Sequence, residues 1–146
     1  MGRRITIVGN GELPLGAADF IDRSDIVIRF NDCRSLGPGG TRTDVVAVCN
    51  TGRPGREMTE GTDWRESDGV RQATAIWSVR DPAKFAEMEP DIRRRWPELT
   101  DFCADYTAAF TAIARETGKS HIVIPRGVHD RLDVAFQPSV ELPERA

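Results

Sequence analysis

The chain has 146 residues, of which 39% are hydrophobic and 29% charged, and its formal net charge is −3 at pH 7. This length and composition suit one globular domain with a buried core and argue against intrinsic disorder. The slightly acidic balance argues against non-specific nucleic-acid binding, which requires a basic surface.

The first half of the chain alternates apolar, β-branched runs with polar segments. Apolar runs that end on glycine or asparagine predict buried strands, and glycines and proline predict a loop. In chain order we predict a strand, a short helix, a strand, a loop and a strand, at residues 3–9, 16–24, 25–30, 31–43 and 44–50.

The second half continues the alternation. We predict a polar stretch, a helix, a strand, the longest helix, a strand and a last helix, at residues 51–62, 63–72, 74–79, 100–118, 121–125 and 126–136. Asp81 is expected to cap a helix with Pro82 at its first position, whereas Pro90 and Pro97 should break the region into short pieces. Alternating strands and helices predict one α/β domain over residues 1–146, a three-layer Rossmann-like, mostly parallel sheet with helices on both faces.

The cysteines and the distribution of apolar residues indicate in which cellular location the chain is expected. Cys33, Cys49 and Cys103 are odd in number and form no C-x-x-C pair, so neither a disulfide framework nor a zinc site is expected. No apolar run approaches the ~20 residues of a membrane span, and no signal peptide precedes the first strand. We therefore expect a cytoplasmic protein with no membrane partner.

Asparagine recurs where the first three predicted strands end. The strand ends read Gly9-Asn10-Gly11, Asn31-Asp32 and Asn50-Thr51. Parallel strands bring their carboxyl ends to one edge, where ligands bind. Asparagine amides suit the polar groups of a nucleotide, and glycine lets backbone N–H groups approach a phosphate. Each of these residues alone is more typical of a turn, but together they predict a nucleotide site made by Gly9, Asn10, Gly11, Asn31, Asn50 and Thr51.

The common nucleotide motifs do not account for this site. Gly9-x-Gly11 is followed by Pro14 where the dinucleotide fingerprint requires its third glycine, and the second strand ends without an acidic residue. No G-x-x-x-x-G-K-[ST] sequence is present. Both hydride transfer and ATP hydrolysis are therefore disfavoured.

The segment "IVGNGELPLGAADFIDRSDIVIRFNDCRSLGPGGTRTD" resembles the large sialyl motif of the sialyltransferases, glycosyltransferase family 29. The matching elements, in order, are Val8-Gly9-Asn10, Gly16, Ile21-Asp22, Asp25-x-Val27-x-Arg29-x-Asn31, Gly37 and Gly40-x-Arg42-Thr43. With "RTDVVAVCNTGRP" and "VRDPAKF", the chain also resembles the short bacterial urease operon accessory proteins.

The sialyltransferase resemblance implies a donor site for a cytidine monophosphate (CMP) sugar, with Asn10 and Asn31 contacting the nucleotide. No cofactor and no metal are implied, because no D-x-D cluster is present. Arg29 lies within an apolar strand, and we expect it to form a structural ion pair with Asp22 or Asp44. The three tryptophans are expected to be core or cover residues rather than a sugar-stacking platform.

The chain also departs from the family. Ile5 replaces the cysteine of secretory-pathway members, and the small sialyl motif and terminal histidine–glutamate motif have no counterpart before Ala146. Because that missing region supplies the family's catalytic base, we expect the amino-terminal part of a longer protein or a shortened relative. His121 opens a strand and is expected to be structural. His129, four residues before Asp133, is a weak catalytic candidate whose alternative is a solvated helix face.

The leading interpretation is the donor-binding domain of a sialyltransferase-like glycosyltransferase that lacks its base. Its partner would be a small-molecule sugar nucleotide, and the sequence does not identify the acceptor. The alternative, from another functional class, is a non-catalytic nucleotide-binding module or urease-operon accessory protein. A histidine base with an acidic partner at the site would distinguish the first interpretation from the second.

Overall fold

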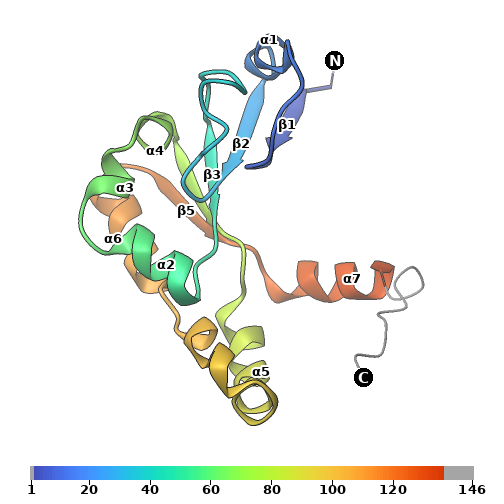
Figure 1. The fold of residues 1–146 in the computed structure, drawn as a ribbon, viewed down its shortest axis with the longest axis vertical. Helices are drawn as coiled ribbons and strands as arrows, with labels where there is room; N and C mark the ends of the chain where they lie inside the picture. Colours follow the sequence, from blue (N-terminus) through green and yellow to red (C-terminus); the bar gives the residue numbers. More distant parts are fainter. Residues whose placement is uncertain (1, 137–146) are drawn as a thin grey trace.

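The computed structural model describes residues 2–136 and contains a five-stranded sheet in which every strand pair is parallel (Figure 1). The spatial order of the strands equals their order in the chain. They are β1 (Ile5–Val8), β2 (Ile26–Phe30), β3 (Val45–Val48), β4 (Ala75–Ser78) and β5 (Ser120–Val123). The predicted α/β class, with a parallel sheet flanked by helices, is confirmed, but within the described residues the helices that share hydrophobic clusters with the sheet pack against one of its faces. The polar sequence at 137–146 lies outside the described residues.

Seven α-helices and one 3₁₀-helix connect or follow these strands within the described residues. They are α1 (Ala17–Asp22), α2 (Gly52–Thr59), α3 (Asp63–Glu66), α4 (Asp68–Gln72), α5 (Pro82–Arg95), η1 (Pro97–Cys103), α6 (Thr107–Glu116) and α7 (Arg126–Phe136). Among residues 2–136, no helix combines the length and apolar character that a membrane crossing needs.

Two predictions for residues 51–72 are wrong. The polar stretch at 51–62, for which no helix is predicted, contains α2, whose buried residues Gly52, Gly55 and Met58 recur every third position along one face. The single helix expected at 63–72 is divided into α3 and α4, because Ser67 has an extended backbone with φ −64° and ψ 150°.

Pro90 does not break the helix in which it lies. The Asp81 carboxylate accepts hydrogen bonds from the backbone N–H groups of Ala83 and Lys84, which confirms the predicted cap. From Pro82 the helix α5 continues through Pro90 to Arg95. Carboxylates near Pro90 pair with arginines three or four residues further on, and such pairs support a helical turn. At 14 residues, α5 is the longest described helix, in place of the helix predicted at 100–118.

The region 100–118 divides because Asp105 starts a new helix. Its carboxylate accepts hydrogen bonds from the backbone N–H and hydroxyl of Thr107, the first residue of α6. The residues before it form η1. Gly118, with φ +69°, follows the helix and provides the expected stop.

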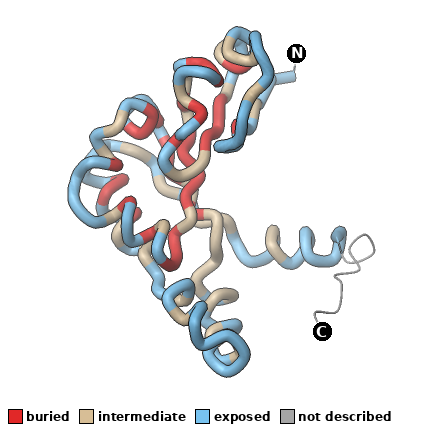
Figure 2. Tube along the Cα trace, in the orientation of Figure 1, coloured by how far each residue is buried: buried red, intermediate tan, exposed pale blue. Residues whose placement is uncertain are grey.

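The main core lies between one face of the sheet and α2, α3, α4 and α6. Val46, Val48 and Ile76 of the sheet share a buried cluster with Phe110 and Ile113 of α6. Figure 2 shows the buried residues concentrated along β2, β3 and the helices beside them. This packing fixes the carboxyl edge of the sheet, where the candidate site lies.

Candidate functional site

A cavity of about 560 Å³ opens at the carboxyl edge of the sheet. Its size lies within the range of small-molecule sites, ~300–1,000 Å³. It lies where the chain leaves β1 and β2 and passes α2 and α3. The lining residues are Asn10, Asn31, Asp32, Arg34, Pro54, Glu57, Met58, Asp63, Trp64 and Ser67.

Asn31 is the most constrained residue of this cavity. Its φ is +50°, a left-handed conformation that asparagine adopts more readily than most residues. Its Oδ1 accepts a hydrogen bond from the Cys49 backbone N–H at 2.9 Å, and its carbonyl accepts one from the Trp64 indole N–H at 2.8 Å. Among the described residues its Nδ2 has no acceptor, which leaves an oriented donor at the cavity wall.

Asn10 and the glycines beside it lie next to Asn31. The Asn10 Nδ2 donates to the Phe30 carbonyl at 3.4 Å, a long hydrogen bond that a ligand could replace. A Cβ atom added at Gly9 or Gly11 would meet no atom within 4 Å. Neither glycine is required by packing within the protein, and the open space beside each leaves room for a ligand to approach the backbone.

A second hollow, of about 380 Å³, adjoins the first. It is lined by Asn10, Gly11, Glu12, Leu13, Arg34, Ser35 and Pro38. Asn10 and Arg34 line both hollows. The two together can accommodate an elongated ligand with chemically different ends.

The charges differ between the two hollows. The first contains three carboxylates, Asp32, Glu57 and Asp63, and its single cation is Arg34, which pairs with Asp32 at 2.6 Å. An anion there would be repelled, so that hollow suits uncharged hydrogen-bonding groups such as a base or sugar hydroxyls. The second hollow has one carboxylate, Glu12, beside Arg34, so its charges are closer to balance and it is the more favourable of the two positions for an anion.

Asn50 and Thr51, two other predicted site residues, are buried beneath this edge. The Asn50 Nδ2 donates to the Arg80 carbonyl at 2.9 Å and to the Thr107 hydroxyl at 2.7 Å, while its Oδ1 accepts from the Arg80 N–H. The Thr51 hydroxyl accepts from the Arg80 guanidinium. Both side chains are 0% exposed and tie β3 to the segments after β4 and before α6. The structure therefore brings Asn10 and Asn31 together at the cavity and keeps Asn50 and Thr51 out of its lining.

Arg29 is structural, as expected, but its partners are not carboxylates. It is 0% exposed, and its guanidinium donates to the carbonyls of Arg42 and Gly39 at 2.9 and 2.7 Å. It also donates to the hydroxyls of Thr43 and Ser35 at 3.1 and 3.0 Å. All these acceptors are neutral and belong to the loop at 31–43, so Arg29 of β2 binds this loop. The predicted ion pair with Asp22 or Asp44 is wrong. Burial lowers the pKa of Arg29.

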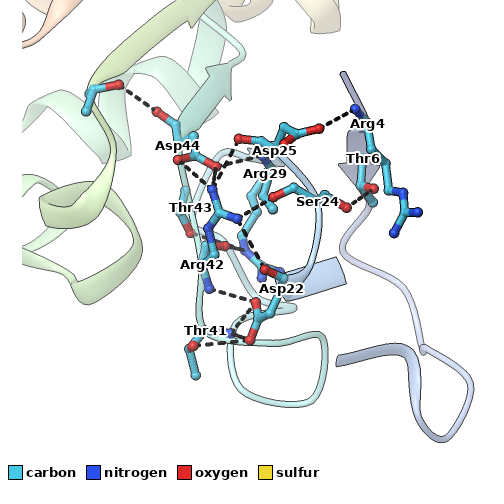
Figure 3. A network of polar contacts seen from close by, with 12 residues as sticks. Arg4, Thr6, Asp22, Ser24, Asp25, Arg29, Thr41, Arg42, Thr43 and Asp44 are labelled. Atoms are coloured by element: carbon cyan, nitrogen blue, oxygen red, sulfur yellow. Dashed lines mark hydrogen bonds and ion pairs between the residues drawn. The ribbon is translucent and has the colours of Figure 1, made fainter. Parts of the chain in front are cut away.

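The two carboxylates expected to pair with Arg29 bind other groups (Figure 3). Asp22 accepts hydrogen bonds from the backbone N–H groups of Thr41 and Arg42. Although desolvation raises the pKa of Asp22, these hydrogen bonds bring it below its ordinary value. Asp44 accepts from the Val27 N–H at 2.8 Å and pairs with the Arg42 guanidinium at 3.0 Å. Asp22, Arg29 and Asp44 thus stabilise the shape of the loop that carries Asn31 and Arg34.

Neither histidine lines the cavity. The two ring nitrogens of His121 are hydrogen-bonded to the hydroxyls of Ser78 and Thr111, at 2.8 and 3.0 Å, in agreement with a structural role. Burial lowers the pKa of His121. His129 lies in a separate hollow of about 140 Å³ between α5 and α7, and the Asp133 carboxylate expected to orient it pairs with Lys84.

The sequence analysis did not predict that α2 and α3 contribute residues to the cavity lining. Pro54, Met58 and Trp64 form one wall of the cavity. Trp64 is 8% exposed and packs edge-to-face on Phe110, so it is the core residue expected from sequence and also part of the site. The three-residue spacing of Gly52, Gly55 and Met58 was the available signal for α2.

Among residues 2–136, no group of three or more histidine, cysteine or acidic side chains gathers where a metal ion could be held. No family model and no solved structure matches the chain.

Two curated proteins are similar to the chain. A urease operon 23 kDa accessory protein from Rhizobium meliloti is 55% identical over 141 residues. The match covers 94% of this chain, and the chain spans about 65% of that relative's length. A UDP-N-acetylmuramoylalanine–D-glutamate ligase from Photorhabdus laumondii is 28% identical over 123 residues, which are 84% of this chain and 26% of the ligase.

Proposed function

We propose that this chain is a non-catalytic accessory module of the urease-operon type that binds a pyrimidine nucleotide sugar at the Asn10–Asn31 cavity. The observation that carries the binding proposal is the Nδ2 of Asn31, which has no acceptor within residues 2–136 and is held in place by hydrogen bonds on the same residue's other polar atoms. The accessory role is supported by the 55% identity to the Rhizobium protein, whose name carries that description.

The sialyl-like motif favours a pyrimidine base as the partner of this Nδ2 donor. Cytosine and uracil both carry a carbonyl oxygen at position 2, which can accept a hydrogen bond from an amide N–H. The CMP sugar implied by the sialyl-like motif and the UDP sugar in the name of the Photorhabdus ligase share this oxygen. We place the base and sugar in the first hollow and the phosphate beside Arg34 and Gly9 to Gly11.

Among the described residues, no histidine lines the cavity, and this supports the non-catalytic part of the proposal. Transfer to an acceptor hydroxyl needs a group that removes its proton, and such catalysis typically contributes ~10²–10⁴-fold in rate. Both histidines of the chain lie elsewhere. Asp32, one of the cavity carboxylates, is paired with Arg34.

The binding proposal is tested by calorimetric titration with CMP, a UDP sugar, adenosine monophosphate and NAD. The pyrimidine ligands should bind at least about tenfold more tightly than the purine ligands, a difference of ~1.4 kcal/mol. Equal or tighter binding of NAD would contradict the proposed ligand class.

Asn31→Asp tests the role of the Asn31 Nδ2 directly, because it removes only this donor. The aspartate keeps an oxygen for the Cys49 N–H and tolerates the left-handed backbone, but it replaces the Nδ2 donor by a charged acceptor. Pyrimidine binding should weaken by about tenfold or more, since a hydrogen bond to the ligand is lost. Gln72→Glu, which adds the same charge on α4 outside the cavity lining, is the matched control and should bind like the wild type.

The non-catalytic part has its own test. The purified chain, incubated with a CMP sugar and a panel of sugar acceptors, should bind the donor without transferring its sugar. Robust transfer that disappears in His129→Ala would show that the chain is an enzyme and that His129 is its base.

A further inference from the structure

The two faces of the sheet are covered differently. Parallel strands in sequential order have their connections on one face when each crossover has the usual right-handed sense, and the five strands here follow that order. The strand register puts two apolar rows on the other face, which we name the open face. These rows are Ile7, Ile28, Val45, Ala75 and Ser120, and Phe30, Ala47, Trp77 and Ile122, with Ile5 and Ile26 beside them.

The open face has its own hydrophobic cluster, to which no described helix contributes a side chain and whose central residues are 4–8% exposed. Its cluster consists of Ile28, Val45, Ala47 and Ala75, with Ile26, Phe30, Trp77 and Val79 packed against them. Every member lies on a strand or directly after one, whereas the cluster on the opposite face includes side chains from α2, α3, α4 and α6. At the margins of the open face Ile5, Ile7 and Ile122 are 56%, 65% and 47% exposed.

The chemistry of the open face indicates a protein layer rather than a polar ligand. Its two rows contain one polar residue, Ser120, and no charge. Parallel sheets occur almost only with both faces covered, usually by helices, because their strands are apolar on both sides. An uncovered apolar face of this kind marks an interaction site.

The size of the open face decides between two occupants. Five strands ~4.8 Å apart, with four residues of ~3.3 Å each, span a flat area of about 300 Å². A stable interface between separate copies buries about 800 Å² per partner. The open face is therefore small for an independent dimer and suits a layer that is linked to the domain.

The relative and the last helix indicate where such a layer comes from. The chain spans about 65% of the Rhizobium protein's length, so a substantial part of that relative has no counterpart in the match. Helix α7 projects away from the sheet, opposite to α2, α3 and α6 (Figure 1), and its Leu132, Val134 and Phe136 are 48%, 67% and 60% exposed.

We propose that the open face is the docking surface for amphipathic helices equivalent to the part of the Rhizobium relative that lies outside the match. This inference does not depend on the ligand proposed for the cavity. It assigns the open face to a linked helical layer rather than to a second copy of this chain.

The experiment compares this chain with a chimera that adds the unmatched part of the relative in the relative's own order. Trp77 reports on the open face in a Trp96→Phe background, because the remaining tryptophan, Trp64, is buried. In the chimera, acrylamide quenching of Trp77 and fluorescence of a bound apolar dye should both fall, and the melting temperature should rise. Unchanged quenching and dye binding would overturn the proposal.

Charged substitutions on the open face complete the test. Ile7→Lys and Ile122→Lys should leave the melting temperature of this chain nearly unchanged, since both side chains are exposed, but should abolish the gain in the chimera. Leu15→Lys, a fully exposed position away from the sheet, is the matched control and should preserve the gain. A dimer of this chain in light scattering that Ile7→Lys dissociates would assign the face to a second copy and overturn the proposal.

Discussion

Arg29 and Asn31 are two residues apart at the end of β2, and the fold uses their polar atoms in different ways. Arg29 directs its guanidinium into the loop at 31–43 and is 0% exposed, with acceptors for Nε and both terminal nitrogens. Asn31 uses Oδ1 and its backbone within the protein and leaves Nδ2 at the cavity. One residue determines the shape of the loop, and the other uses that shape to present a donor.

The comparison shows how structural and binding residues can be separated within one motif. A polar side chain whose donors and acceptors are all paired inside the protein contributes to stability, and removing it leaves partners unpaired. A side chain that is fixed at some atoms and free at another is a candidate ligand contact. Asn50 belongs with Arg29 by this criterion, although its residue type and strand position match those of Asn31.

Arg29→Met should have the largest effect on stability. It leaves the carbonyls of Gly39 and Arg42 without their buried donor, and each unmade hydrogen bond costs about 1–3 kcal/mol. We expect a loss of about 3 kcal/mol or more in the free energy of unfolding, measured by urea denaturation.

The control for this substitution is Arg115→Met, at an exposed position of α6. It should change the free energy of unfolding by less than about 0.5 kcal/mol. If Arg29→Met instead abolished nucleotide binding while stability held, Arg29 would belong to the site and the distinction from Asn31 would fail.

Asn50→Ala and Asn31→Ala test the separation of two asparagines at neighbouring strand ends. Asn50→Ala should destabilise the protein by about 2–3 kcal/mol, because the Arg80 N–H and carbonyl and the Thr107 hydroxyl lose a buried partner. Asn31→Ala loses one side-chain hydrogen bond but also strains the left-handed backbone, so its effect on stability is compared through Asn31→Gly, which tolerates that backbone. Asn31→Gly should cost about 1 kcal/mol, and both Asn31 variants should weaken ligand binding more strongly. Equal losses of stability in thermal unfolding would remove the basis for assigning the two residues different roles.

The smallest expected effect is on the pH dependence of stability. It comes from His121, whose two ring nitrogens are both hydrogen-bonded within the protein. Burial lowers the pKa of His121 in the folded state, so below about pH 6.5 the unfolded chain binds more protons there than the folded chain. This contribution to stability is complete above that pH and declines as the pH falls. The wild type should therefore lose more stability than His121→Asn between pH 7.5 and pH 5.5, measured by urea denaturation. Parallel losses in the two proteins would contradict the assigned direction.

The sequence by itself determined the strands, their parallel arrangement and the edge at which polar residues gather. Short β-branched runs such as those around Val27 and Val46 carry this information locally, because strand preference and burial depend on a few neighbouring side chains. The helix start at Asp81 and the helix end at Gly118 could also be predicted, since a helix end depends on one residue and its nearest backbone groups. The presence of Asn10 and Asn31 at one edge follows from the same local rules.

Only the tertiary structure decided which polar atoms remain free and which face of the sheet remains uncovered. Asn50 is internal because Arg80 and Thr107, 30 and 57 residues further along the chain, reach its amide. Arg29 avoids the expected ion pair because the loop folds its carbonyls and hydroxyls onto the guanidinium, while Asp22 and Asp44 bind the loop elsewhere. Such pairings depend on contacts between distant residues, and residue type and spacing do not specify them. The open apolar face is likewise decided by strand order, because sequential parallel strands put their crossovers on a single side.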